Sequence, residues 1–115
     1  MKRGDLLTVA VPGDFGKPRP ALVIQADAFL RHDSVAVLPL TSTLAQNAPW
    51  LRVAVTPNDQ NGLKVQSQVM VDKITAVRKE RLGAVFGSVG RDTMIEIERG
   101  LAAILGFAGS GRSSA

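Results

Sequence analysis

The chain has 115 residues, of which 45% are hydrophobic and 21% charged, a balance typical of one globular domain rather than of a disordered chain. It contains no cysteine and one histidine, which excludes disulfides, thiol nucleophiles, cysteine-ligated zinc and any site that needs two histidines from one chain. The net charge of +4 permits a polyanionic partner such as nucleic acid, and apolar runs such as Ala21–Ile24 are far shorter than the roughly 20 residues of a membrane span.

The first predicted strand is Leu6–Val11, and basic residues precede it. This basic and then apolar start is similar to an export signal, but Asp5 and Thr8 interrupt it and no small-residue cleavage site follows. We therefore expect no signal peptide and a cytoplasmic protein. The strand is followed by Pro12–Pro18, where prolines and glycines favour a loop.

The middle of the chain predicts three more strands. Arg19–Gln25 is mostly apolar, as is typical of a strand buried on both faces, and Val35–Leu40 is a second apolar run. Between them, Asp27–Arg31 predicts one short helical turn. Leu51–Thr56 alternates between apolar and more polar positions, which is typical of a half-buried strand.

The next segments predict a turn and two strands. Pro57–Gly62 is rich in turn-forming residues, and Ala84–Val89 has the pattern of a short, weaker strand. Between these segments, Val65–Thr75 alternates in character and predicts one continuous strand. The residues expected to share one face of it are Val65, Ser67, Val69 and Val71.

Helical spacing is found near the C-terminus. Asp92 or Thr93 is expected to cap the start of the helix, and Gly106 and Gly109 mark its end. Residues 108–115 are expected to form a flexible tail, which leaves a single domain at residues 1–107. The apolar positions at three- and four-residue steps are Met94, Ile97, Leu101, Ile104 and Ala108.

Short strands followed by one terminal helix predict a mainly β protein. We expect a small twisted antiparallel sheet or partly open barrel on which the C-terminal helix packs. A barrel of this size leaves sheet edges and a flat face uncovered. Pairing of two copies is a common remedy, so we expect a homodimer.

Polar side chains near strand ends are the candidates for chemistry. Arg19 enters its strand from a loop that carries Asp14, and Thr41 and Ser42 follow an apolar strand. Each has a structural alternative: a salt bridge at the sheet rim for Arg19, turn formation for Asp14, and a polar strand end for the two hydroxyls. Asp72 lies late in a mostly uncharged strand, where a buried carboxylate needs a partner, and this favours a structural role.

Three common kinds of site are disfavoured. His32 lies in a charged segment without the elbow motif of a serine hydrolase, so a solvated loop histidine is the simpler interpretation. The glycines of Gly13–Pro18 lack the lysine–serine ending and following helix of a phosphate-binding loop. The acidic residues form no obvious cluster, so we expect no metal and no cofactor.

The remaining groups suit phosphoryl transfer on RNA. A guanidinium matches a phosphate and stabilises the additional charge of a pentavalent transition state. A hydroxyl can hold a second phosphate oxygen, and a carboxylate can accept a proton. RNA supplies its own nucleophile, the 2′-hydroxyl, so this chemistry fits a chain that lacks cysteine and has one histidine.

Five sequence motifs together resemble the MazF/PemK toxins of type II toxin–antitoxin systems. The order and spacing of these motifs match over most of the chain, roughly residues 2–107. The motifs are KRGDLLTVAV (2–11), GKPRPALVIQ (16–25), VAVLPLTST (35–43), SQVMVDKITAV (67–77) and KERLGAVFGSV (79–89).

This resemblance implies an SH3-like, partly open β-barrel with a C-terminal helix, assembled as a homodimer. It also implies a sequence-selective, metal-independent endoribonuclease that cuts single-stranded messenger RNA and leaves a 2′,3′-cyclic phosphate and a 5′-hydroxyl. The implied partner is a cognate antitoxin protein, which would lay an extended acidic segment over the basic RNA groove.

The family's catalytic residues are carried over position by position. Arg19 matches the arginine before the second strand and is expected to stabilise the phosphorane or to protonate the leaving oxygen. Thr41 matches a phosphate-binding threonine, and Ser42 is expected to assist it. Asp14 matches a loop acid of some members and is the candidate base, and Asp72 matches a strand aspartate.

Further residues are expected to contact RNA. They include Asp72, Lys17 and Lys73. Some members carry a second arginine at the position of Met70, so Lys17 or Lys73 is expected to supply the missing positive charge. Trp50 is a candidate for stacking on an unpaired base, although core or rim packing is the simpler interpretation.

Two other functions remain open at this point. A CcdB-like toxin with the same fold would poison DNA gyrase by protein contact, through the end of its C-terminal helix, where this chain has no strong aromatic anchor. A degenerate scaffold would bind RNA without cutting it. This alternative stays open because Met70 stands where some members carry an arginine that they use in catalysis.

Overall fold

The structure, a computed structural model, describes residues 1–10, 17–48 and 50–107. Asp14 and the expected tail at 108–115 lie outside these residues. The described strands are β1 (Asp5–Ala10), β2 (Pro18–Val23), β3 (Ser34–Thr41), β4 (Arg52–Val55), β5 (Ser67–Met70), β6 (Thr75–Arg78) and β7 (Leu82–Ser88). The α-helix is α1 (Arg91–Leu105), and the 3-10 turns are η1 (Asp27–Phe29), η2 (Val71–Lys73) and η3 (Lys79–Arg81).

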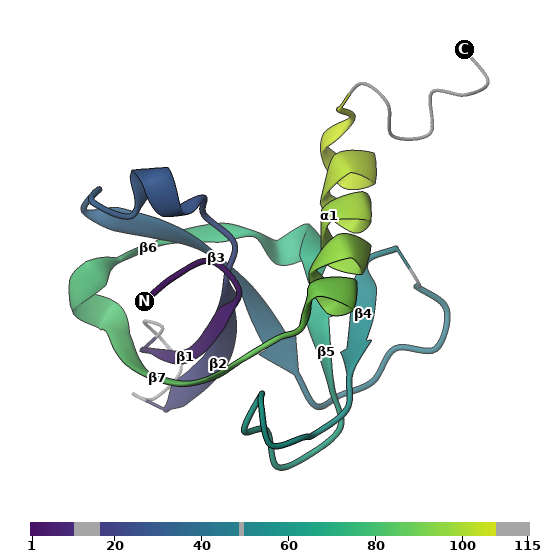
Figure 1. Ribbon diagram of the computed structural model, residues 1–115. Helices are drawn as coiled ribbons and strands as arrows, with labels where there is room; N and C mark the ends of the chain where they lie inside the picture. Colours follow the sequence, from purple (N-terminus) through teal and green to yellow (C-terminus); the bar gives the residue numbers. More distant parts are fainter. Residues whose placement is uncertain (11–16, 49, 108–115) are drawn as a thin grey trace.

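The strands form one antiparallel sheet in the order β4-β5-β3-β2-β1-β7. The remaining strand, β6, pairs with a different part of β3 from the part that pairs with β5. The sheet curls without closing, and α1 stands beside β4 and β5 (Figure 1). This arrangement confirms the prediction of a mainly β, partly open fold with a C-terminal helix.

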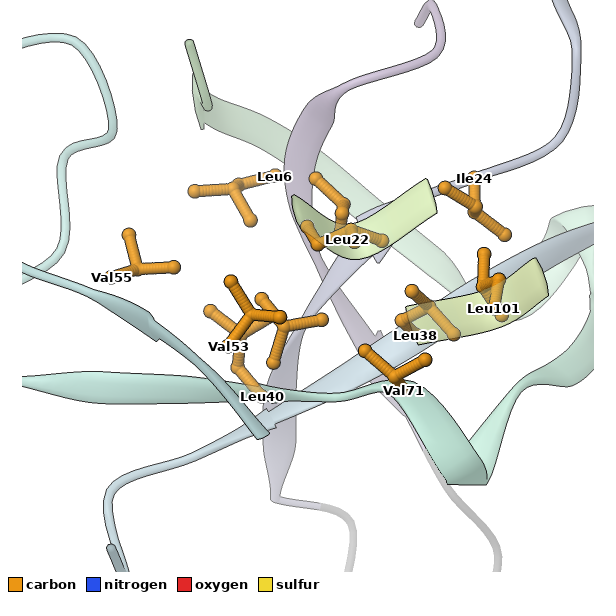
Figure 2. Packing of buried hydrophobic residues seen from close by; sticks show 11 residues of the cluster. Leu6, Leu22, Ile24, Leu38, Leu40, Val53, Val55, Val71 and Leu101 are labelled. Carbon is orange, nitrogen blue, oxygen red and sulfur yellow. The ribbon is translucent and has the colours of Figure 1, made fainter. Parts of the chain in front are cut away.

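The core has two apolar clusters because the central strands are apolar on both faces. On β1, Leu6 belongs to one cluster and Leu7 to the other, and on β2 the same holds for Leu22 and Val23. Burial on both faces explains the continuous apolar run of β2. Figure 2 shows the larger cluster, which includes Leu101 of α1.

The prediction of one strand over Val65–Thr75 is wrong. The segment contains β5, η2 and the first residue of β6, and both strands pair with the same strand, β3. Leu40 lies opposite Val69, and an unbroken register would set Val37 opposite Asp72, yet Val37 lies opposite Thr75. The three residues of η2 therefore absorb a register shift along β3.

Helix α1 packs on β4 and η2 through Ile97 and Leu101, as predicted. At buried Gly100 an added Cβ would lie 2.4 Å from the carbonyl oxygen of Trp50, so a glycine permits this close crossing. Gly106 ends the helix in the left-handed conformation, as expected (φ 71°).

Two details of the helix prediction are wrong. Gly90 is the N-cap, and Asp92 and Thr93 already lie inside the helix. Ile104 is 46% exposed, because the periodic pattern continues beyond the part of the helix that the sheet covers.

Candidate functional site

The candidate site is a groove that opens where β2 and β3 separate. Their pairing ends at Ala21 opposite Pro39, and neither Pro20 nor Pro39 has an N–H group to extend the ladder. Beyond this point β2 stays paired with β1, whereas β3 pairs with β5 through Thr41 and Gln68. The first residues of β2 and the last residues of β3 therefore form parts of one groove.

The groove has a volume of about 700 Å³. Its described lining contains two cations, Arg19 and Lys64, and no carboxylate. The hydroxyl-bearing residues of the lining are Thr8, Thr41, Ser42, Thr43 and Ser67. A positively charged groove rich in hydroxyl donors is suited to a phosphate-containing ligand.

Arg19 lies in the part of β2 that borders the groove, and its residue surface is exposed. Its backbone pairs with Val9 of β1, and the ring of the following Pro20 restricts the chain. The paired strand fixes the position from which the Arg19 side chain lines the groove, and a guanidinium there is suited to binding a phosphate.

Thr41 is half-buried at the end of β3 and lines the same groove. The backbone N–H of Thr43 donates to its Oγ1 at 3.0 Å, which fixes the hydroxyl oxygen by a short-range turn. The hydroxyl proton of Thr41 is then available to donate to a ligand. Ser42 follows and is exposed in the groove, so the structure brings Arg19, Thr41 and Ser42 together.

Another part of the lining comes from residues 62–65, which follow a turn fixed on β7. The Asn61 side chain is buried: its Oδ1 accepts hydrogen bonds from the N–H groups of Asn58 (3.0 Å) and Leu63 (2.9 Å). The N–H of Ser88 in β7 donates to the carbonyl of Gln60 at 3.0 Å. The segment Pro57–Gly62 was predicted as a turn, but nothing in its pattern indicated that it positions Lys64 in the groove.

The other predicted RNA-contacting residues lie outside this groove. Lys17 is exposed just before β2, and Lys73 is exposed in η2. Met70, at the position where the family resemblance implies an arginine in some members, does line the groove. Within the described residues, the second positive charge of the groove therefore belongs to Lys64 rather than to Lys17 or Lys73.

Asp72 forms an ion pair with Arg52, whose strand position faces Met70. Partial burial of the Asp72 carboxyl acts to raise its pKa, but the hydrogen bond and positive charge of Arg52 outweigh this and hold the pKa below its ordinary value. The side chain is 25% exposed. This geometry favours the structural interpretation of Asp72.

Trp50 is 61% exposed, so the core-packing interpretation is wrong. It borders a shallow depression with Leu51 and with Ala103 and Ile104 of α1, which is compatible with packing at the rim. His32 lies near Phe29, with ring centroids 6.0 Å apart, and does not line the groove.

Neither a cluster of metal ligands nor a membrane-spanning helix is present in the described parts of the chain. Over residues 1–10, 17–48 and 50–107, no three histidine, cysteine, aspartate or glutamate side chains lie close enough together to hold a metal ion. No helix in these same ranges is long and apolar enough to cross a membrane.

Comparison with known proteins gives consistent matches over nearly the full length. The family model of the PemK-like, MazF-like toxin of type II toxin–antitoxin systems matches residues 2–105. The chain is 41% identical over 110 residues to a probable endoribonuclease MazF of Mycolicibacterium smegmatis, covering 95% of this chain and 100% of the relative.

Solved structures show the same fold. An endoribonuclease in complex with its cognate antitoxin, from a mycobacterial species, superposes with a TM-score of 0.77 at 30% identity, covering 93% of this chain and 96% of that one. The Mycobacterium tuberculosis toxin MazF-mt6 gives 0.75 at 20% identity, with 89% and 96% covered, and supports the fold alone.

Proposed function

The chain belongs to the PemK-like, MazF-like toxins of type II toxin–antitoxin systems, and on this basis we propose that it is an endoribonuclease that cuts single-stranded messenger RNA in the Arg19–Thr41 groove. The observation that carries the site assignment is the convergence of Arg19, Thr41 and Ser42 in a groove whose described lining has no carboxylate. The cations of this lining attract an anionic strand, and no carboxylate among its described residues repels it.

The reaction starts from the ribose 2′-hydroxyl next to the scissile phosphate. The 2′-oxygen attacks phosphorus, its proton passes to a base, and a bond forms that closes the 2′,3′-cyclic phosphate. The bond from phosphorus to the 5′-oxygen breaks, and that oxygen takes up a proton and leaves as a 5′-hydroxyl. No metal or protein nucleophile takes part in these steps.

The groove residues have distinct roles in this reaction. Arg19 stabilises the negative charge that grows on the phosphorane oxygens and is placed to donate to the leaving oxygen. The Thr41 hydroxyl, fixed by Thr43, donates to a non-bridging phosphate oxygen, and Ser42 assists it. Asp14, in the segment outside the described residues, is the candidate base.

The partners follow from the family. A relative at 30% identity was solved in complex with its cognate antitoxin, which supports an antitoxin partner for this chain as well. We propose that an acidic segment of that antitoxin occupies the groove and competes with RNA, and that the toxin acts in the cytoplasm as a homodimer. The match to the PemK/MazF family disfavours a CcdB-like gyrase poison.

Cleavage of single-stranded RNA by purified protein in excess chelator tests the proposal. We expect activity without added metal, a loss of about 100- to 1000-fold in Arg19→Ala, and a loss of about 10- to 100-fold in Thr41→Ala, which removes a hydrogen bond to a charged group. Arg31→Ala, which removes an exposed arginine outside the groove, serves as the control and keeps wild-type activity.

Two results would contradict this assignment. Loss of wild-type cleavage in chelator would overturn the metal-independent reaction, and full activity in Arg19→Ala would overturn the site. Intact RNA together with stalled DNA replication in cells that express the chain would favour gyrase poisoning instead.

A further inference from the structure

One part of the groove combines a positive charge with an aromatic ring, and the steps of catalysis do not use either. Lys64 is exposed and lines the groove, and Phe86 of β7 lines it with 38% of its surface exposed. Phe86 is the sole aromatic residue in the described lining. By contrast, the exposed Trp50 borders the separate depression beside α1.

Gly62 links these two residues, because it packs against Phe86 and lies two positions before Lys64 in the chain. A Cβ at Gly62 would lie 2.7 Å from the carbonyl oxygen of Phe86 and 3.4 Å from its ring atom Cδ1, so the turn touches β7 closely at this point. Gly62 has a φ of 66°, a conformation that favours glycine, and carries no side chain that would cover the ring. Lys64 follows two residues later on the same fixed segment.

A charged group and a partly exposed ring in the lining of one groove are suited to binding one nucleotide of a single strand. An unpaired base can stack on the ring, and the lysine ammonium can bind the phosphate of the same or the adjoining nucleotide. We propose that Lys64 and Phe86 form a binding subsite for a nucleotide that neighbours the cleaved one. This inference rests on the proposed function, because it assumes that single-stranded RNA occupies the groove.

Binding of a non-cleavable RNA measures the two contacts separately. The probe is a fluorescein-labelled pool of random single strands in which every ribose is 2′-O-methylated, and fluorescence anisotropy is followed at several salt concentrations. In Lys64→Gln we expect the slope of log affinity against log salt to become shallower by about 0.7, the value for one phosphate contact on a single strand. In Phe86→Leu we expect binding about tenfold weaker with an unchanged slope.

Matched variants control for charge and for loss of a ring. Lys79→Gln removes the same charge and Phe29→Leu removes an exposed ring, both outside the groove, and both are expected to leave the slope and the affinity near wild type. Lys64→Arg and Phe86→Tyr keep the charge and the ring and should also bind like wild type. Thermal unfolding checks that each variant is folded.

Three results would overturn the subsite. The first is an equal change of slope in Lys64→Gln and Lys79→Gln. The second is unchanged affinity in Phe86→Leu, and the third is a change of molecular mass in Phe86→Leu, since a second copy would then be what covers the ring. If the wild-type protein cleaves RNA but Lys64→Gln and Phe86→Leu bind RNA normally, the subsite alone fails. If the wild-type protein neither binds nor cleaves RNA, the proposed function fails as well.

Discussion

At the scale of single residues, the Arg52–Asp72 pair illustrates how a conspicuous carboxylate serves the fold. The pair links β4 to the 3-10 turn η2, where the register along β3 shifts. Because the carboxylate is partly exposed and its partner is an arginine, the pair resembles surface ion pairs, which contribute about 0.2 to 1 kcal/mol. It holds the turn without approaching the groove.

The Asp72 pair makes stability depend on pH in a defined direction. The folded-state pKa lies below the ordinary 3.8, so the pair stabilises the fold above that pH, and the contribution is lost as the pH falls through the folded-state value. Asp72→Asn should therefore be less stable than wild type at pH 7, and the difference should shrink below about pH 3.8. Urea unfolding at several pH values measures this.

A matched variant separates the pair from general charge effects. Glu96→Gln removes an exposed carboxylate of α1 and should give a much smaller difference at pH 7. A difference between Asp72→Asn and wild type that stays constant down to low pH would show that the ion pair is not its source.

At the scale of elements, the docking of the Asn58–Gly62 turn on β7 decides where the groove residues lie. At Gly87 of β7, an added Cβ would lie 2.1 Å from the carbonyl oxygen of Asn61, so only glycine lets the turn approach this closely. The buried Asn61 side chain completes the contact by holding the backbone of the turn. The position of Lys64 in the groove therefore depends on a glycine in a different strand.

Gly87→Ala tests this dependence. The clash should displace the turn, lower stability by about 1 to 3 kcal/mol, as overpacking commonly does, and weaken RNA cleavage because Lys64 moves with the turn. Gly90→Ser is the control, since an added Cβ there would lie 3.8 Å from the Gln60 side chain, an ordinary contact, and serine is a favourable N-cap. Chemical unfolding and cleavage rates are the measurements, and wild-type stability in Gly87→Ala would contradict the argument.

The strands show which elements a sequence pattern can predict. β2 and β3 were predicted from their apolar runs because burial on both faces leaves a continuous pattern. The alternation at Val65–Thr75 misled because it continues through η2, where Val71 is buried and Asp72 is not, so a 3-10 turn and a strand produce the same pattern. In this stretch the alternation follows the burial of Ser67, Val69 and Val71 but does not show where the backbone turns.

At the scale of the whole molecule, the groove itself needed the three-dimensional fold. Arg19 and Thr41 could be proposed from the sequence because each adjoins an apolar strand. The role of Lys64 could not, because it depends on contacts such as that between Gln60 and Ser88, residues distant in the sequence, and no local pattern encodes such a contact.

The homodimer is a prediction at this scale. Among the described strands β7 pairs with β1 alone, and apart from its Ser88 N–H, which is bonded to Gln60, its far edge beside the exposed Val85 is available to a partner. Light scattering at micromolar concentration should give twice the 12.2 kDa mass of the chain. A mass of one chain under these conditions would count against the family-like assembly.

The long strand β3 joins regions that differ in local stability. Val37 and Leu38 belong to different apolar clusters, and the strand is paired on both edges at Val37. Thr41, at its end, is paired with β5 alone. We therefore expect the amides in the middle of β3 to exchange hydrogen only when the whole domain opens, and those at its end to exchange when the β4–β5 hairpin opens locally. The end of the strand, where we propose that Thr41 binds phosphate, is therefore expected to adjust to a bound RNA at a small fraction of the cost of unfolding the domain.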